Sequence, residues 1–416
     1  MQDIHDLVSE VTQKYINPKA ITDPDLKWTL ERISANVTPQ QSQKTEPTKS
    51  QKHLQQLRLT EEQIAETLSN CESDLVSFIR EKPDKFNSSS GHEEDRNTES
   101  SELIENVSRK AANEILKTLS RRIPRLISEA NKEDKRFYNK EISPLWGDPL
   151  NRLNILIRIS ESANIQRVDI TKKESQNAVF VVLARLSAKS IRVAKEINVL
   201  LKSGFAEGAY ARWRTLHEAE VIANIIFSCG EVLASRYLAH ASVRVFESLK
   251  KIKNREGVEE ADNIESFKYQ ELKKEYDDVI ARYGFNFRYE YGWASEELGM
   301  KKPTFVDIEN AANMTSQRAS YGFASGMIHC GSFGMFADIM QEAGSSDLLS
   351  GPSQLGLAIP GRDTARSLGM ISLRFLAHRP TIESLVWMRL ISRYIQLSIN
   401  AFTEIEHKID DALAAG

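Results

Sequence analysis

Cysteine is scarce in this chain of 416 residues, which has only three: Cys71, Cys229 and Cys330. They lie far apart and form no Cys-x-x-Cys pair, which excludes a disulfide framework and a zinc knuckle and favours a reducing compartment. No apolar run approaches the roughly 18 residues of a transmembrane helix, and the first residues are acidic where a signal peptide carries lysine or arginine. We therefore expect a soluble, cytoplasmic protein without a membrane partner.

Phosphate-binding loops and metal-ligand motifs are also missing from the sequence. It has no Gly-x-x-x-x-Gly-Lys-Ser/Thr loop and no Gly-x-Gly-x-x-Gly turn after a strand, which argues against an ATP site and a dinucleotide site. The eight histidines form no His-Glu-x-x-His or His-x-His pair, although residues distant in sequence could still converge on a metal. The sequence thus predicts no cofactor and no metal.

Neither sign of charge dominates, because 55 lysines and arginines face 58 aspartates and glutamates, a formal net charge of -3. This balance excludes the global positive field of a general nucleic-acid binder, so any such site must be local. Two short helices predicted at 60–68 and 73–80 could form a helix-turn-helix. The second has too few cations for phosphate contacts, which argues against DNA as a partner.

The remaining composition is that of a folded protein, with 41% hydrophobic and 27% charged residues. Two polar tracts, 36–52 and 82–101, have the composition of linkers. Between them the capping box Thr60-Glu61-Glu62-Gln63 predicts the start of a helix. We therefore predict a helical N-terminal module at 1–81 with an internal linker, a second linker at 82–101, and a C-terminal bundle at 102–416.

Helical periodicity dominates the C-terminal part, and short connections between long amphipathic helices favour an all-α bundle of antiparallel neighbours. The first helix should end at a basic cluster around Pro124, and the aromatic stretch 285–302 should form an extended segment or a buried loop. Thr304 should cap a short helix, and 350–361 should form a loop. The longer helices are predicted at 178–203, 207–230, 231–255, 264–283, 316–329, 363–378 and 380–414.

One predicted helix combines an apolar sequence with four ionisable groups at Arg212, Arg214, His217 and Glu218. Arg214 shares a helix face with His217 and Glu218, because the spacings are three and four residues. Burying such groups is costly unless they are paired. The pattern therefore indicates either an internal network that fixes helix packing or a functional site.

A second row of polar residues lies at Tyr321, Ser325 and His329, spaced by four residues along another predicted helix. This spacing puts two hydroxyl groups and an imidazole along one edge, where they can reach a common ligand. A hydrogen-bonded core histidine explains His329 equally well. We expect this row and that of Arg214, His217 and Glu218 to face a single cleft.

These motifs resemble a bacterial, all-helical family known only as a domain of unknown function. The resemblance covers about 145–336 and implies no activity, because a common fold does not fix a function. Its landmarks are the segment Gly208–Glu218, the pair Arg236-Tyr237, and Tyr321-x-x-x-Ser325-x-x-x-His329 followed by Cys330-Gly331-Ser332.

The spacing of Arg212 and His217 also resembles the Arg, four to six residues, His pattern of the HEPN (higher eukaryotes and prokaryotes nucleotide-binding) nucleases. That resemblance implies a homodimeric, metal-independent endoribonuclease acting on RNA as a toxin or in phage defence. Arg212 would hold the phosphate and His217 would act as acid or base. Trp213 departs from the small polar residue usual there, and the motif lies in mid-bundle rather than near its end. The surrounding shell would comprise Arg214, Glu218, Tyr321, Ser325 and His329. The alternative is a non-catalytic binding or regulatory bundle in which these residues form a structural network.

Overall fold

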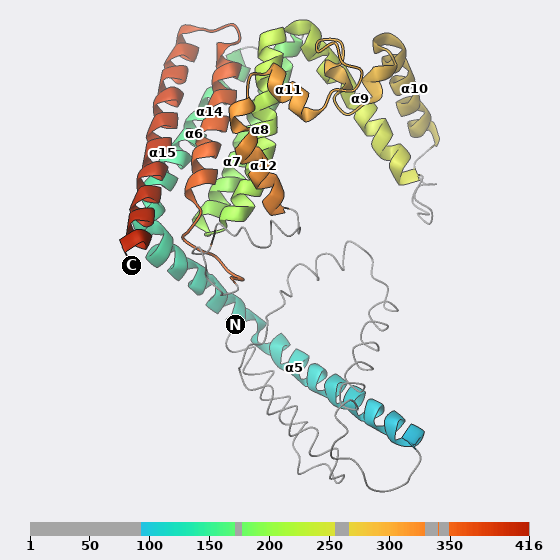
Figure 1. The fold of residues 1–416 in the computed structure, drawn as a ribbon, viewed down its shortest axis with the longest axis vertical. Helices are drawn as coiled ribbons and strands as arrows, with labels where there is room; N and C mark the ends of the chain where they lie inside the picture. Colours follow the sequence, from blue (N-terminus) through green and yellow to red (C-terminus); the bar gives the residue numbers. More distant parts are fainter. Residues whose placement is uncertain (1–92, 171–176, 254–265, 329–339, 341–348, 416) are drawn as a thin grey trace. The chain divides into compact units, whose positions relative to one another are not determined.

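The computed structural model describes residues 93–170, 177–253, 266–328, 340 and 349–415. The chain divides into two units, Met1–Glu133 and Asp134–Gly416. The described residues form helices and turns without any strand, which confirms the predicted all-α class (Figure 1). Among the helices so described, none has the length and apolar character required to cross a bilayer. The N-terminal capping box at Thr60 lies outside these residues.

The first described helix, α5 (Glu93–Phe137), is longer at both ends than the sequence indicates. It includes 93–101, which we assigned to a linker, and it continues through Pro124, so a helix end at the basic cluster is wrong. A proline removes one backbone donor, and the surrounding helix-forming residues carry the helix past it. Arg125 and Glu129, four residues apart, form an ion pair beyond the proline (Nε to Oε1, 2.8 Å).

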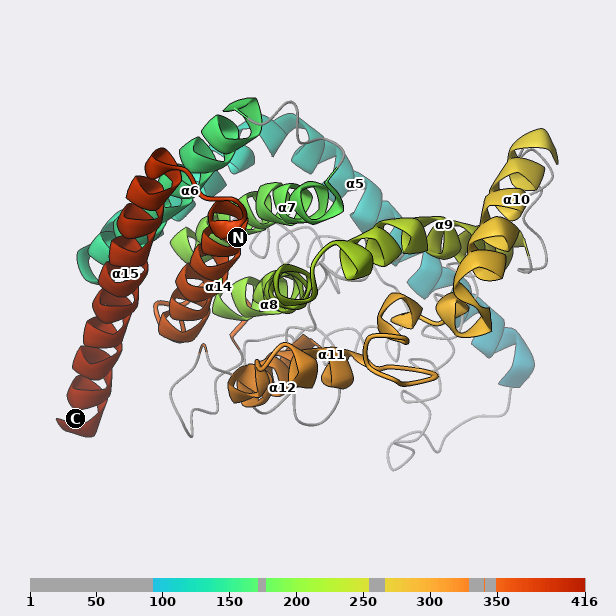
Figure 2. The ribbon, with the colours of Figure 1, turned by 90° about the horizontal axis from the view of Figure 1, so that it is seen from above.

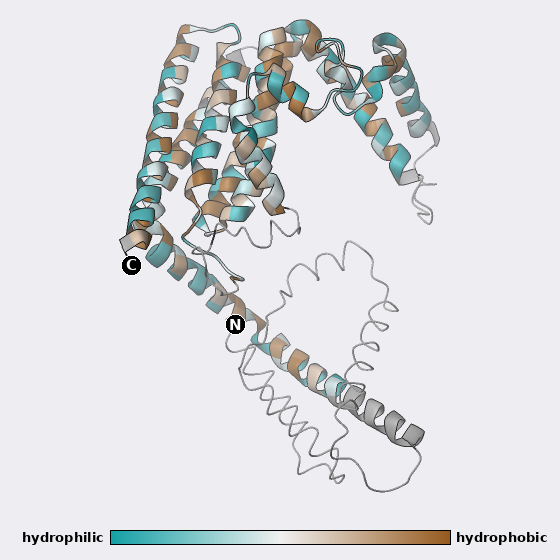
Figure 3. Cartoon of the chain, in the orientation of Figure 1, coloured by the Kyte–Doolittle hydropathy of each residue, from teal (hydrophilic) through white to brown (hydrophobic). Residues whose placement is uncertain are grey.

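The bundle of the second unit is built around α14 (Ala358–Ala377). This helix contacts α6 (Ser143–Ile170), α7 (Ala178–Lys202), α8 (Ala206–Cys229) and α15 (Ile382–Ala415). Viewed from above, α14 lies between α15 and the pair α7 and α8 (Figure 2). Hydrophilic and hydrophobic residues alternate around these helices (Figure 3), and the apolar faces form one core. Its largest fully buried side chains include Trp146, Trp213, Phe375 and Phe402.

The ends of α7 and α8 follow from local capping. The Asn177 side chain accepts from the Phe180 amide (2.8 Å), and the Glu231 carboxylate accepts from the Ala178 amide (2.7 Å). These acceptors satisfy amide groups that a helix N-terminus leaves unpaired. Gly204 and Gly230, both with positive φ, end the two helices. The predicted helices at 178–203 and 207–230 are thereby confirmed to within a residue.

Helix α9 (Glu231–Lys253) and helix α10 (Ser266–Tyr283) follow as predicted within the described residues. The aromatic stretch then forms two 3-10 turns, η5 (Phe285–Arg288) and η6 (Gly292–Ala294), so it is a loop with a buried centre and not an extended segment. Thr304 forms a capping box with Asp307 at the start of α11 (Phe305–Ala311), as expected. A 3-10 turn, η7 (Thr315–Gln317), precedes α12 (Arg318–Ile328).

Two elements differ from the sequence prediction in the bundle itself. Helix α6 was not predicted, because Pro144, Gly147 and Pro149 near its start are signals for a loop. Helix α14 begins at Ala358, inside the stretch assigned to a loop. Pro360 lies in its first turn, where its missing amide hydrogen has no partner to lose.

Gly361 allows close packing of α14 against α15, and its replacement by alanine should destabilise the fold. A Cβ there would lie 2.5 Å from Cζ of Phe402, whose ring is fully buried. Overpacking typically costs about 1–3 kcal/mol, which outweighs the roughly 1 kcal/mol gained in helix propensity. Urea unfolding should therefore show Gly361→Ala below wild type. The control Gly322→Ala, where an added Cβ would meet no described atom within 4 Å beyond the helix's own backbone, should equal or exceed wild type; equal behaviour of both variants would contradict the close approach.

Candidate functional site

The ionisable residues of α8 leave the helix in different directions. Arg212 and His217 are five residues apart, which corresponds to a rotation of about 140° around the helix. Arg212 pairs with Glu196 on α7 and also donates to the Thr215 hydroxyl (3.3 Å). His217 turns inward and is fully buried. The structure therefore does not bring the Arg212 guanidinium and the His217 imidazole together.

His217 contacts the segment that carries α11, η7 and α12. Its Nε2 lies 2.8 Å from Oε1 of Glu309, and neither side chain has any exposure. The other oxygen of Glu309 accepts from Nη1 of Arg318 (3.2 Å). The imidazole is also enclosed by the rings of Trp213 and Tyr321, each with its centroid 5.3 Å away. This imidazole is thus an interior link between helices.

Gln317 completes the interior network around His217. Its side chain is best oriented with the amide nitrogen donating to Nδ1 of His217 (2.8 Å) and the oxygen accepting from the guanidinium of Arg366. The opposite orientation would point the amide nitrogen of Gln317 at the Arg366 N–H groups, which would then have no acceptor. In this arrangement Nδ1 accepts and Nε2–H donates to Glu309, so the ring has no hydrogen-bonding nitrogen left for a ligand.

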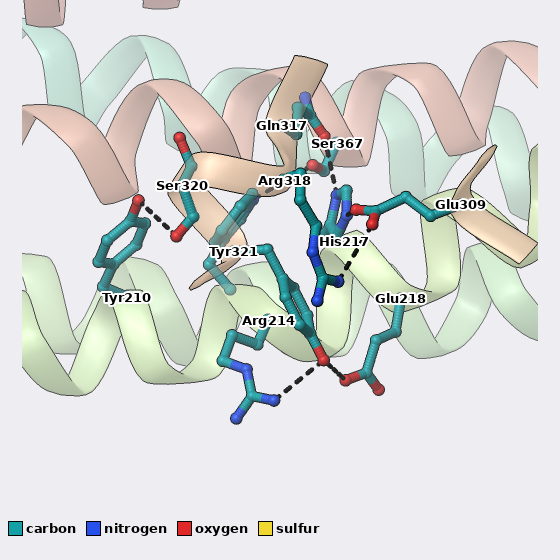
Figure 4. Close-up of polar contacts among 11 residues, drawn as sticks. Tyr210, Arg214, His217, Glu218, Glu309, Gln317, Arg318, Ser320, Tyr321 and Ser367 are labelled. Carbon is teal, nitrogen blue, oxygen red and sulfur yellow. Dashed lines mark hydrogen bonds and ion pairs between the residues drawn. The ribbon is translucent and has the colours of Figure 1, made fainter. Parts of the chain in front are cut away.

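A second, less buried cluster joins α8 to α12. The phenol oxygen of Tyr321 accepts from Nη2 of Arg214 (2.9 Å) and donates to Oε1 of Glu218 (2.8 Å), as Figure 4 shows. The guanidinium carbons of Arg214 and Arg318 lie 4.7 Å and 5.4 Å from the centroid of the Tyr321 ring. Arg214 and Glu218 are half-buried, whereas Tyr321 is 9% exposed. We call Arg214, Glu218 and Tyr321 the seam cluster.

The seam cluster holds its proton on the phenol. Burial raises the pKa of Tyr321 above its ordinary value, the hydrogen bond from Arg214 lowers it, and the neighbouring Glu218 carboxylate raises it again. Nε of Arg214 is buried and has no hydrogen-bond partner among the described residues. The cluster therefore combines a cation with unused hydrogen-bonding capacity, a neutral phenol and a carboxylate.

The prediction that the two helices carrying the polar rows pack together is confirmed, whereas the single cleft that both rows should face stays a prediction. Helices α8 and α12 pack together, and Tyr321 bonds to Arg214 and Glu218 across their contact. Ser325 is half-buried on the same helix. His329 lies outside the described residues, so its place in the predicted cleft stays a prediction.

Helix α14 supplies polar residues to the interior that the sequence analysis missed. Glu220, which is 5% exposed, lies beside Ser367, whose hydroxyl oxygen also accepts from Nε1 of Trp213 (3.2 Å). Burial raises the pKa of Glu220, against the opposing effect of its Ser367 hydrogen bond and of Arg366. A signal for this cluster was present, because 361–367 places three charged residues in an apolar stretch. No comparable sequence signal marked Glu309, because it lies on a seven-residue helix that is too short to show a helical periodicity.

Asp363 is a second carboxyl of this interior cluster with a raised pKa. Burial raises its pKa from 3.8 to about 6, although Arg366 and Arg362 lower it; Glu220 raises it and His217 lowers it. One oxygen of Asp363 is buried without a hydrogen-bond partner among the described residues. Compared with the unfolded chain, the folded protein therefore favours the protonated acid of Asp363.

This raised pKa predicts that stability falls as the pH rises from about 4 to 6. In that window the folded state keeps a proton that the unfolded chain has released. This rise in the pKa of Asp363 corresponds to a change of about 3 kcal/mol at most in the free energy of unfolding. We expect Asp363→Asn to be about 1–3 kcal/mol more stable than wild type at pH 8 and equal to it below pH 4. Urea unfolding across this range checks the prediction, and a variant that is less stable at every pH would contradict it.

The landmark pair Arg236-Tyr237 lies elsewhere, on α9. Arg236 is 5% exposed, donates from Nε to the carbonyl of Trp293 (3.0 Å), and pairs with Glu296. Its guanidinium also lies 5.0 Å from the ring centroid of Tyr283. These contacts hold the aromatic loop against α9 and α10, which assigns Arg236 a structural role.

Within the described ranges, no group of three or more histidine, cysteine, aspartate or glutamate side chains could hold a metal ion.

The fold and the site together define an all-α bundle with a polar seam between α8 and α12. Residues 180–346 match the model of a family of unknown function (DUF5677). This span includes α7, α8 and α12, and hence both sides of the seam cluster. Searches of curated proteins and of solved structures found no match to the chain.

Proposed function

We propose that this protein is a metal-independent endoribonuclease that acts at the seam cluster. The observation that carries the proposal is the pair of hydrogen bonds at the Tyr321 phenol, from Arg214 (2.9 Å) and to Glu218 (2.8 Å). They hold a guanidinium and a carboxylate beside one oxygen, at the half-buried edge of the α8–α12 contact. A cation that binds phosphate then lies next to a group that accepts a proton, which is the pair that RNA cleavage without a metal requires.

The proposed step is attack of a ribose 2′-hydroxyl on the adjacent phosphorus. Glu218 takes the proton of the 2′-hydroxyl, the new P–O2′ bond forms and the P–O5′ bond breaks. Arg214 stabilises the charge on the phosphoryl oxygens. Tyr321 positions both groups. The products are a 2′,3′-cyclic phosphate and a 5′-hydroxyl, whose proton must come from the side opposite Glu218. We assign that proton donor to His329, which follows Tyr321 and Ser325 at four-residue spacing.

This proposal keeps the activity implied by the HEPN resemblance but changes the residues. Arg212 is occupied by Glu196, and His217 is fully buried with both ring nitrogens bonded. Arg214 and Glu218 replace them as the phosphate-binding and proton-accepting groups. A homodimer and a role as a toxin or in phage defence remain part of the proposal, as that resemblance implies.

Cleavage of total cellular RNA by the purified full chain, with and without EDTA, tests the proposal. We expect cleavage to persist in the chelator and to leave 2′,3′-cyclic phosphate ends. Inducible expression in a bacterium should also arrest growth. Loss of activity in EDTA with recovery on adding a divalent ion would overturn the metal-independent mechanism. Absence of both cleavage and growth arrest would overturn the nuclease proposal.

The second candidate is a non-catalytic binding or regulatory bundle. It is favoured by the complete burial of the His217–Glu309 pair, which is typical of a network that fixes helix packing. In that case substitutions in the seam cluster would change the stability of the protein or its binding to a partner, and neither wild type nor variant would cleave RNA. Absence of RNA cleavage together with a large stability loss in a His217 variant would favour this candidate.

A further inference from the structure

A cavity of about 510 Å³ lies on the bundle unit, away from the seam cluster. It is formed where the end of α5 and a π-helical turn, η2 (Tyr138–Ile142), meet the turn between α7 and α8. Its volume lies within the range of small-molecule sites. Phe205 at its edge is nine residues before Arg214 on α8, or roughly 13 Å along the helix axis. The lining includes Lys135, Phe137, Tyr138, Lys202, Phe205 and Pro352.

The cavity wall is held in place by backbone contacts. Gly204 has φ +75°, and a Cβ there would lie 2.7 Å from the Phe137 ring and 2.8 Å from the Ser353 carbonyl oxygen. The Gly204 carbonyl accepts from the Ser353 amide (2.9 Å). Only glycine combines this conformation with this close approach. The π-helical turn beside it is a feature that recurs at functional sites. The pocket is therefore formed before any ligand arrives.

The lining combines aromatic rings with positive charge. Phe137, Tyr138 and Phe205 contribute three rings, and Phe205 is 42% exposed although it is a large apolar residue. The ammonium groups of Lys135 and Lys202 form no hydrogen bond or ion pair with any described residue, and Asp134 is the one acid of the described lining. Aromatic rings bind planar bases by stacking, and free ammonium groups bind phosphate.

We propose that this cavity binds a nucleotide, with the base against the aromatic rings and the phosphate at Lys135 and Lys202. The proposal does not depend on the nuclease activity, since none of these residues belongs to the seam cluster. The bound ligand would be a mononucleotide, because the lining offers one group of aromatic rings and one pair of cations.

Isothermal titration of the full chain with AMP, adenosine and inorganic phosphate tests this proposal. AMP should bind more tightly than adenosine or phosphate alone, because only AMP uses both the rings and the lysines. Phe205→Ala and Lys202→Ala should each weaken AMP binding about tenfold. The control variants Phe285→Ala, at an aromatic residue 60% exposed elsewhere, and Lys301→Ala should bind as wild type.

Three results would overturn the proposal. They are no detectable AMP binding, equal binding of phosphate and AMP, and wild-type affinity in both cavity variants. Equal binding of adenosine and AMP would remove the role of the lysines. Circular dichroism of each variant separates loss of binding from loss of fold, and the conservative change Phe205→Tyr should retain AMP binding.

Discussion

Replacing His217 by alanine is expected to lower the free energy of unfolding by about 3–5 kcal/mol, because it removes one partner of a fully buried pair. Glu309 would keep only Arg318, whose side chain is 44% exposed, while its other oxygen would face a cavity. That cavity would be lined by the rings of Trp213, Phe305 and Tyr321. Urea unfolding monitored by circular dichroism measures the loss.

A double-mutant cycle separates the pair from its surroundings. Glu309→Gln should retain a hydrogen bond to Nε2 of His217 and cost less than His217→Ala. The double variant should cost less than the sum of the two, since the second change removes a group that the first leaves unpaired. A loss below about 1 kcal/mol in His217→Ala would contradict a structural role. If RNA cleavage then disappeared as well, His217 would be a catalytic residue after all.

The fold was predictable wherever a helix ends at a local signal. Thr304 caps a helix, and Gly204, Gly230 and Gly284 close helices at the predicted ends. The wrong predictions occur at prolines, which can end a helix but can also lie within one. Pro124 and Pro149 lie inside helices, because packing and flanking residues outweigh one lost amide donor, whereas Pro360 lies in a first turn, where no donor is lost.

The site was predictable only where spacing along one helix decides the outcome. Four-residue spacing placed Arg214 with Glu218, and the expectation that α8 faces the helix of Tyr321 is confirmed. The resemblance to the HEPN pattern also suggested that Arg212 and His217 act together, but the helix turns them toward different neighbours. Which residues meet His217 depends on tertiary packing, so Glu309, Gln317 and Arg366 were not predictable from local pattern.

The largest effect on the proposed activity is expected for Glu218→Gln. A positioned general base contributes roughly 10²- to 10⁴-fold to a rate, and glutamine cannot accept the 2′-hydroxyl proton. The fold should survive, since the glutamine oxygen can still accept from the Tyr321 phenol. Arg214→Lys should also cost about 10²- to 10³-fold, because an ammonium lacks the planar fork of donors. The measurement is the rate of cleavage of a defined RNA in EDTA.

Matched variants distinguish the seam cluster from the pair that the HEPN pattern suggests. Glu404→Gln is the same chemical change at an exposed position of α15, where the carboxylate pairs with Lys408, and should leave the rate at the wild-type level. Tyr321→Phe keeps the ring between the guanidinium groups of Arg214 and Arg318 but removes the hydroxyl that aligns Glu218. It should reduce the rate less than Glu218→Gln and alter the pH profile, since the carboxylate loses a hydrogen-bond donor. Arg212→Ala removes the ion pair with Glu196 and the hydrogen bond to Thr215, both outside the seam cluster, and should retain most of the activity. Full activity in Glu218→Gln, with loss in a stably folded Arg212→Ala, would transfer the phosphate site to Arg212 and leave the seam cluster as packing.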